Sequence, residues 1–175
     1  MSEKICLLEY DLEQLKNLIV SIGEKSFRAG QIFKALHLGL DFSEITELKK
    51  DFREKLEQEY IAQPVKIIKS LKSVDGTEKF LFALTDGNVV EGVLMKYKYG
   101  YTLCVSTQVG CRMGCAFCAS GLHGLIRNLT PSEILGEVIA ANRHLEGGLS
   151  DKRKIREKGG KMKVVISNED DSCDG

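Results

Sequence analysis

The segment TLCVSTQVGCRMGCAFCASG, residues 102–121, carries four of the six cysteines of this 175-residue chain. Three of them, Cys111, Cys115 and Cys118, have the spacing C-x3-C-x2-C, and Cys104 lies seven residues before the first. The preceding residues, YTLCVSTQV, are rich in β-branched and aromatic side chains and predict a strand. The segment therefore predicts a strand that leads directly into a thiol-rich loop.

A helix is predicted immediately after this loop, over TPSEILGEVIAANRHL. Thr130 has the position of an N-cap, Pro131 stands at the first helical position, and Glu133 completes a capping box. The predicted order is strand, cysteine loop, helix.

The cysteine spacing limits the chemistry of the loop. Gly110 and Gly114 allow the backbone to fold tightly, so that three thiols can face one point. Zinc knuckles normally use two C-x2-C pairs and four ligands, whereas this loop has one such pair. Three thiols suit an iron–sulfur cluster in which one iron has no protein ligand and can bind a substrate or cofactor. Two alternatives are a zinc-binding RNA-interaction module that also uses Cys104 and His123, and a non-catalytic chain without metal.

The rest of the chain predicts an α+β fold. Residues 11–60 have helical periodicity in three short amphipathic stretches, which form a small bundle, and the third is interrupted near Thr46. Strands are predicted near 65–71, 78–84 and 88–95, and the Asp-Gly pairs at 75–76 and 86–87 mark hairpin turns. KMKVVIS, residues 161–167, is a further candidate strand. The domains expected are a helical domain (1–62), a β-hairpin segment (63–100), a core that begins with the cysteine loop (101–166) and an unstructured tail (167–175).

Composition excludes several classes of protein. Lys plus Arg and Asp plus Glu both number 25, so the chain has no net positive charge. A positively charged surface that binds nucleic acid must therefore be confined to one part of the chain. Residues 143–163 hold eight basic and three acidic side chains, which suits a solvated loop or, alternatively, a contact with RNA phosphate.

Neither a signal peptide nor a membrane span is recognisable. We therefore expect a cytoplasmic protein with reduced thiols. We expect Cys6 to be buried and to serve as a small hydrophobic residue.

The cysteine loop, with an aromatic residue before its last cysteine, resembles that of the radical S-adenosylmethionine (SAM) superfamily. Together with RNLTPSEILGEV it resembles more closely the radical SAM adenine-C2 RNA methyltransferases. GEKSFRAGQIFKAL, DFSEITELKKDFREKL and SVDGTEKFLFAL extend this resemblance, which covers roughly residues 5–145. It implies the first strand, loop and helix of a partial (β/α) barrel. It also implies methyl transfer from SAM to carbon 2 of an adenosine in large-subunit ribosomal RNA and, in many bacteria, tRNA; a sister family methylates carbon 8.

The resemblance also implies roles for individual residues. Cys111, Cys115 and Cys118 match the ligands of a [4Fe-4S] cluster, whose open iron binds SAM and whose electron cleaves it to a radical. Phe117 matches the position whose backbone contacts the SAM adenine. Cys104 matches a thiol that resolves a covalent protein–RNA intermediate, and Glu91 matches a glutamate near the target adenine. Without the resemblance, Cys104 reads as a buried strand cysteine and Glu91 as an exposed strand carboxylate.

The resemblance ends before the C-terminus. The Gly-Glu-Pro-type motif of the family, which holds the SAM amino group, has no match here, and neither has its second, methyl-carrying cysteine. Cys173 receives no role. We therefore expect the N-terminal half of such an enzyme, truncated and inactive alone. The expected partners are ribosomal RNA, tRNA and an electron donor such as flavodoxin or ferredoxin, with no membrane, and the chain is expected to be a monomer.

Overall fold

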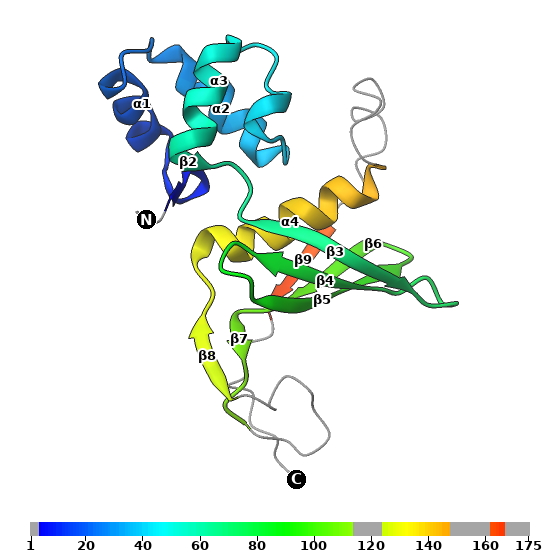
Figure 1. The fold of residues 1–175 in the computed structure, drawn as a ribbon. Coiled ribbons are helices and arrows are strands. Elements are labelled where there is room, and N and C mark those ends of the chain that lie inside the picture. The colour runs from blue at the N-terminus through cyan, green and yellow to red at the C-terminus, as the bar shows by residue number, and fades with distance from the viewer. Residues whose placement is uncertain (1–3, 114–123, 148–161, 167–175) are drawn as a thin grey trace. The chain divides into compact units, whose positions relative to one another are not determined.

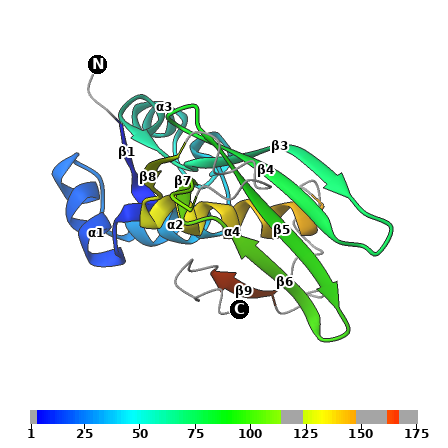
Figure 2. The same ribbon diagram turned by 90° about the horizontal axis from the view of Figure 1, so that it is seen from below.

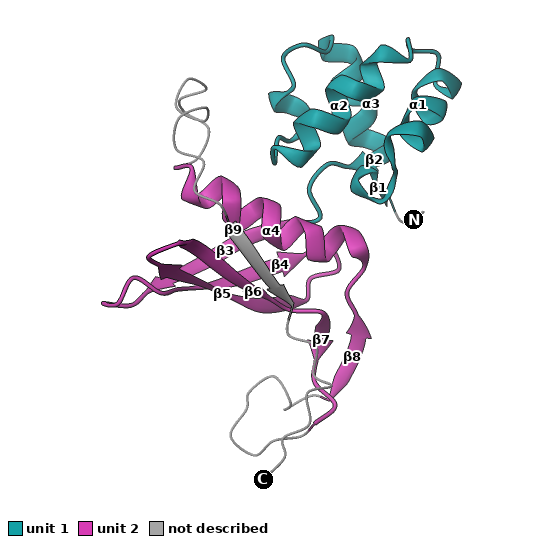
Figure 3. Ribbon diagram, turned by 180° about the vertical axis from the view of Figure 1, so that it is seen from behind, with its two compact units in different colours: residues 1–64 teal, residues 65–175 magenta. Residues whose placement is uncertain are grey.

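The computed structural model describes residues 4–113, 124–147 and 162–166, the last range by its backbone alone. The chain divides into two compact units, residues 1–64 and 65–175 (Figure 3). The finer division into four domains stays a prediction. No helix within the described ranges is long and apolar enough to cross a membrane.

The first unit is helical. Its elements are β1 (Ile5–Cys6), the 3-10 turn η1 (Leu7–Glu9), α1 (Leu12–Ser21), α2 (Phe27–His37), the 3-10 turn η2 (Phe42–Glu44), α3 (Lys50–Glu59) and β2 (Tyr60–Ile61). Strands β1 and β2 pair in parallel at the two ends of the unit. The three predicted helices are confirmed, and the break expected near Thr46 separates η2 from α3.

Local sequence explains the bounds of α1. The Asp11 carboxylate accepts the Gln14 N–H at 2.7 Å, and the Gln14 side chain accepts the Asp11 N–H at 2.9 Å, so both halves of a capping box form. The apolar faces of the helices supply the core of this unit, and Cys6 is buried as expected. Fully buried side chains here include Leu7, Leu15, Ile19, Ile32, Leu36 and Leu56.

The second unit is built on a five-stranded sheet with the order β3-β4-β5-β6-β9. The first three pairings are antiparallel, and β9 pairs in parallel with β6. The predicted Asp-Gly turns join the strands as expected, with Gly76 and Gly87 both at positive φ. The strands are β3 (Val65–Lys72), β4 (Glu78–Leu84), β5 (Val89–Tyr97), β6 (Gly100–Val105) and β9 (Met162–Ile166).

Helix α4 (Pro131–Leu145) lies along one face of this sheet (Figures 1 and 2). Alternate strand residues point toward α4, as the two-residue period of a strand requires. They form one apolar cluster with Ala141 of the helix. Its strand members include Phe80, Phe82, Val90, Leu94, Leu103 and Val105.

Gly92 marks a tight point in this core. A Cβ at this position would lie 2.6 Å from the Phe82 ring and 3.0 Å from the carbonyl oxygen of Cys104. Because Gly92 has no side chain, the backbone of β5 can lie directly against the Phe82 ring and close to the backbone of β6. Mixed helix and strand content with an antiparallel sheet is confirmed. That residues 101–166 begin a (β/α) barrel stays a prediction.

Candidate functional site

The cysteine segment begins where β6 leaves the sheet. Ser106 follows the last residue of β6, and two elements hold it: its hydroxyl donates to the Glu91 carbonyl on β5 at 2.8 Å, and its N–H donates to the Glu137 carboxylate on α4 at 3.2 Å. The direction in which the chain leaves the sheet is therefore set by a neighbouring strand and by the covering helix.

A short two-stranded ribbon then forms a neck for the cysteine segment. Strands β7 (Gln108–Gly110) and β8 (Leu125–Asn128) pair antiparallel, and Figure 1 shows this ribbon leaving the sheet at one end. The Gln108 side-chain amide donates to Asn128 Oδ1 at 2.9 Å, and the Leu129 N–H donates to the Thr107 carbonyl at 2.8 Å. The ribbon brings together the two ends of the segment that contains the three cysteines.

Two glycines make the neck narrow at its far end. Gly110 has φ +76°, and a Cβ there would stand 2.0 Å from the Gly124 carbonyl oxygen. The next residue, Cys111, donates its N–H to the same carbonyl at 3.2 Å. A residue with a side chain at position 110 would be strained by its φ and would collide with backbone. The glycine before Cys111 is thus required by the closure of the neck.

Cys111 is the one predicted cluster ligand that the structure describes. It is buried, and its Sγ accepts the Met113 N–H at 3.4 Å. Cys115, Phe117, Cys118 and the alternative zinc ligand His123 lie outside the described residues, as does Cys173. The described residues contain no group of three His, Cys, Asp or Glu side chains that could hold a metal ion.

Glu91 and Cys104 share a face of the sheet, the one opposite α4. Cys104 stands directly across from Val93 on β5, so Glu91 is its diagonal neighbour on that face. Such diagonal neighbours are roughly 7–8 Å apart, within reach of long side chains. The Glu91 carboxylate pairs with Lys79 of β4 at 2.7 Å, and both side chains are about half exposed. Cys104 is partly buried.

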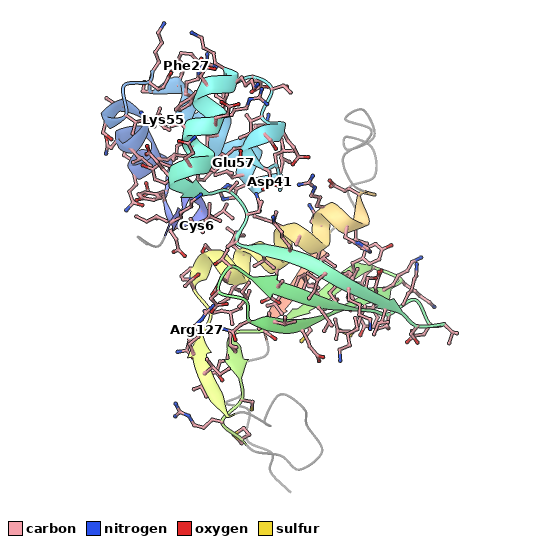
Figure 4. The ribbon with its side chains drawn as sticks, viewed as in Figure 1. Cys6, Phe27, Asp41, Lys55, Glu57 and Arg127 are labelled. Atoms are coloured by element: carbon pink, nitrogen blue, oxygen red, sulfur yellow. The ribbon has the colours of Figure 1, made fainter. Side chains whose placement is uncertain are left out.

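Arg127 was not singled out from the sequence. Its guanidinium binds the Asp86 carboxylate of the β4–β5 turn at 2.6 and 2.8 Å, and both Glu133 carboxylate oxygens at 2.7 and 2.8 Å. Figure 4 labels this side chain on β8. Because Arg127 donates to Glu133, it holds the pKa of that carboxyl below its ordinary value. Arg127 thereby joins the neck, the hairpin turn and the first turn of α4.

Glu137 is the second residue that sequence reasoning missed. Its side chain is fully buried, and one oxygen accepts the Ser106 N–H. The other, Oε1, has no hydrogen-bond partner among the residues that the structure describes. Burial raises the pKa of Glu137 to about 8, because a charged carboxylate is poorly solvated there. Its position on a helix among apolar residues, in EILGEVI, was the one available signal in the sequence.

Comparison with known proteins identifies close relatives. Residues 5–61 match the model of the ribosomal RNA large subunit methyltransferase N-terminal domain. A probable dual-specificity RNA methyltransferase RlmN of Lachnoclostridium phytofermentans is 53% identical over 146 residues, which are 82% of this chain and 41% of that protein. The corresponding protein of Alkaliphilus oremlandii is 47% identical over 78% of this chain and 40% of its own length. This chain thus spans about two fifths of the length of these relatives.

A solved structure agrees with these sequence matches. The crystal structure of a radical SAM methyltransferase from Sphaerobacter thermophilus superimposes with a TM-score of 0.73 at 38% sequence identity. The match covers 82% of this chain and 43% of that one.

Proposed function

Because the chain belongs to the RlmN-like RNA methyltransferase family and corresponds to an N-terminal part of its members, we propose that it carries the cluster-binding part of a radical SAM RNA methyltransferase. The whole enzyme transfers a methyl group from SAM to carbon 2 of an adenosine in large-subunit ribosomal RNA and in tRNA. One observation carries this proposal: after β6, an internal strand of the sheet, the chain passes through the β7–β8 neck, which encloses the segment with three cysteines, and then enters α4.

The residues present fit an iron–sulfur cluster. Cys111, Cys115 and Cys118 would hold a [4Fe-4S] cluster with one open iron, and SAM would bind there beside the Phe117 backbone. The buried Cys111 sulfur already accepts a backbone N–H, the kind of hydrogen bond that tunes cluster ligands. When bound, the cluster supplies SAM with one electron. The chain's own contribution is to close the neck at Gly110, where the Cys111 N–H donates to the Gly124 carbonyl.

Cys104 and Glu91 belong to the RNA side of the proposed site. Both lie on the sheet face opposite α4 and near the end of β6 that enters the cysteine segment. Glu91 would lie against the target adenine, and the Cys104 thiol would resolve the covalent protein–RNA intermediate. Lys79, paired with Glu91 at 2.7 Å, holds this carboxylate toward β4 in the absence of RNA.

The fold around the site suits the beginning of a (β/α) barrel. β6 and β9 are parallel neighbours, and α4 lies between them in the chain and covers the sheet. Such strand–helix–strand units are the repeating element of these barrels. We propose that β6, α4 and β9 are the first unit of the radical SAM core, and that further units of the whole enzyme complete it.

The remaining roles follow from the family. The helical unit, residues 1–64, would help to seat a folded RNA, and a flavodoxin or ferredoxin would reduce the cluster. We place the activity in the cytoplasm, where thiols stay reduced, and expect the chain to be a monomer.

Metal analysis after anaerobic purification and reconstitution tests this proposal. We expect brown protein with about four irons and four sulfides per chain, as a single [4Fe-4S] cluster requires. Addition of SAM should change the electron paramagnetic resonance spectrum of the reduced cluster, because the open iron gains ligands. Colourless protein with one zinc per chain would contradict the proposal and favour a zinc-binding RNA module.

A further inference from the structure

Lysine and tyrosine alternate in the turn that joins β5 to β6. The sequence KYKYGY, residues 96–101, places Lys98 and Tyr99 at the tip, because Tyr97 pairs with Gly100. The rings of Tyr97 and Tyr99 stack 5.1 Å apart and within 7° of parallel. Their side chains are 45% and 69% exposed. The stacked pair of rings, here called the platform, thus lies on the surface of the protein and is not part of the core.

The turn that carries the platform also carries positive charge, and Lys96, which precedes Tyr97 on β5, points to the opposite face of the sheet. Lys96 and Lys98 are exposed, and neither has an ion-pair partner in the part of the chain that the structure describes. The acidic residues of the neighbouring β3–β4 hairpin have other partners. Asp75 accepts hydrogen bonds from the N–H and the hydroxyl of Thr77 in its own turn, and Glu78 contacts His144 at 2.9 Å. The two lysine charges therefore remain available to an anionic ligand.

The two hairpin tips lie together at one end of the sheet. A Cβ at Gly76, in the β3–β4 turn, would lie 4.0 Å from Cδ of Lys96. Figure 2 shows both turns at the end of the sheet away from the β7–β8 neck. β6 runs from this tip to the cysteine segment, and six extended residues span roughly 17–20 Å. The platform is thus separate from the proposed reaction site.

We propose that Lys96, Tyr97, Lys98 and Tyr99, here called the lysine–tyrosine tip, bind an unpaired part of the RNA substrate. Proteins recognise single-stranded and loop RNA by stacking bases on aromatic rings, and their lysines neutralise the adjacent phosphates. RNA is the occupant that uses both features, since a purely acidic partner would need the lysines alone. The inference rests on the proposed function. It adds a second contact, one strand length from the reacting adenosine.

Paired substitutions in the full chain test the tip. Binding of a fluorescently labelled RNA stem–loop is measured by anisotropy at several salt concentrations. Tyr97→Leu with Tyr99→Leu should weaken binding about five- to a hundredfold, the usual effect of losing one stacked base. Tyr97→Phe with Tyr99→Phe keeps the rings and should bind within about twofold of the unmodified chain, by the same reasoning.

The lysines are tested by salt dependence. Lys96→Gln with Lys98→Gln should lower the slope of log affinity against log salt by roughly 0.7 per lost phosphate contact. Lys66→Gln, an exposed position on β3 distant from the tip, is the matched control and should change neither slope nor affinity. A fully paired RNA duplex should lose the dependence on tyrosine and keep the dependence on lysine.

The outcomes separate this inference from the proposed function. If the unmodified chain binds RNA and the leucine substitutions leave its affinity unchanged, the proposed role of the lysine–tyrosine tip is wrong. The proposed function is not affected by that result. Equal weakening by Lys66→Gln and by the tip lysines would lead to the same conclusion, because it would indicate general charge attraction. No binding of RNA even at low salt would count against both.

Discussion

At the scale of single residues, the buried carboxyl of Glu137 is expected to make the stability of the fold depend on pH. Its carboxyl is buried with a pKa raised to about 8, whereas in the unfolded chain it should have an ordinary value near 4.5. The folded protein therefore keeps a proton that the unfolded chain releases, and this residue's contribution to stability is lost as pH rises between these two values. Each unit of pKa difference corresponds to about 1.4 kcal/mol.

Glu137→Gln removes this proton linkage and keeps an acceptor for the Ser106 N–H. We expect the variant to lose less stability than the unmodified chain between pH 5 and pH 8.5, as measured by urea unfolding at each pH. Glu146→Gln, at an exposed position at the end of the same helix, is the control and should follow the unmodified chain. Parallel curves for Glu137→Gln and the unmodified chain would contradict the assignment.

At the scale of elements, Arg127 is expected to hold three of them together. Arg127→Gln leaves the nearly buried Glu133 carboxylate without its cation and frees the β4–β5 turn, so the free energy of unfolding should fall by about 1–3 kcal/mol. Arg127→Lys should recover only part of this loss, because lysine cannot donate in a planar fork to two carboxylates.

A double-mutant cycle with Asp86→Asn measures the coupling across this link. We expect the effects of Arg127→Gln and Asp86→Asn to be less than additive in denaturant unfolding, since either change breaks the same ion pair. Fully additive effects would mean that the turn and the neck are held independently.

The elements show which parts of the fold can be predicted from sequence. The three hairpin strands and α4 are local in origin: Asp-Gly turns, period-two alternation and a capping box define them, and the predicted strand at 161–167 corresponds to β9 (Met162–Ile166). The β7–β8 neck and the two-residue pair β1–β2 were not predicted. Each is very short and exists because distant segments meet, so no periodicity in the sequence indicates it.

The candidate site divides in the same way. Spacing alone brought Cys111, Cys115 and Cys118 together as candidates, and the resemblance added Phe117, Cys104 and Glu91. Arg127 and Glu137 were missed because each also acts through a distant partner, 41 residues away for Arg127 and 31 for Glu137. A long-range hydrogen bond leaves no local signal in one sequence; the place of Glu137 among apolar helix residues indicated burial but not its partner.

At the scale of the whole molecule, we expect this 175-residue chain not to methylate RNA by itself. The resemblance assigns the SAM amino group to a Gly-Glu-Pro-type motif and the methyl group to a second cysteine, and the sequence matches neither. The assay combines reconstituted protein, a reductant, methyl-labelled SAM and unmodified ribosomal RNA or tRNA. Label at adenine carbon 2 above a heat-inactivated control would show that these residues are sufficient.

The central claim is that three cysteines beyond the neck hold an open iron–sulfur cluster, and iron and sulfide content in a cysteine series tests it most directly. Each chain is reconstituted anaerobically and checked for folding by circular dichroism. We predict that Cys111→Ala, Cys115→Ala and Cys118→Ala each lose the cluster. Cys104→Ala, on the strand before the neck, should retain the iron and sulfide of the unmodified chain. Loss of the cluster in Cys104→Ala equal to that in the other three, or its retention in any of those three, would contradict the account.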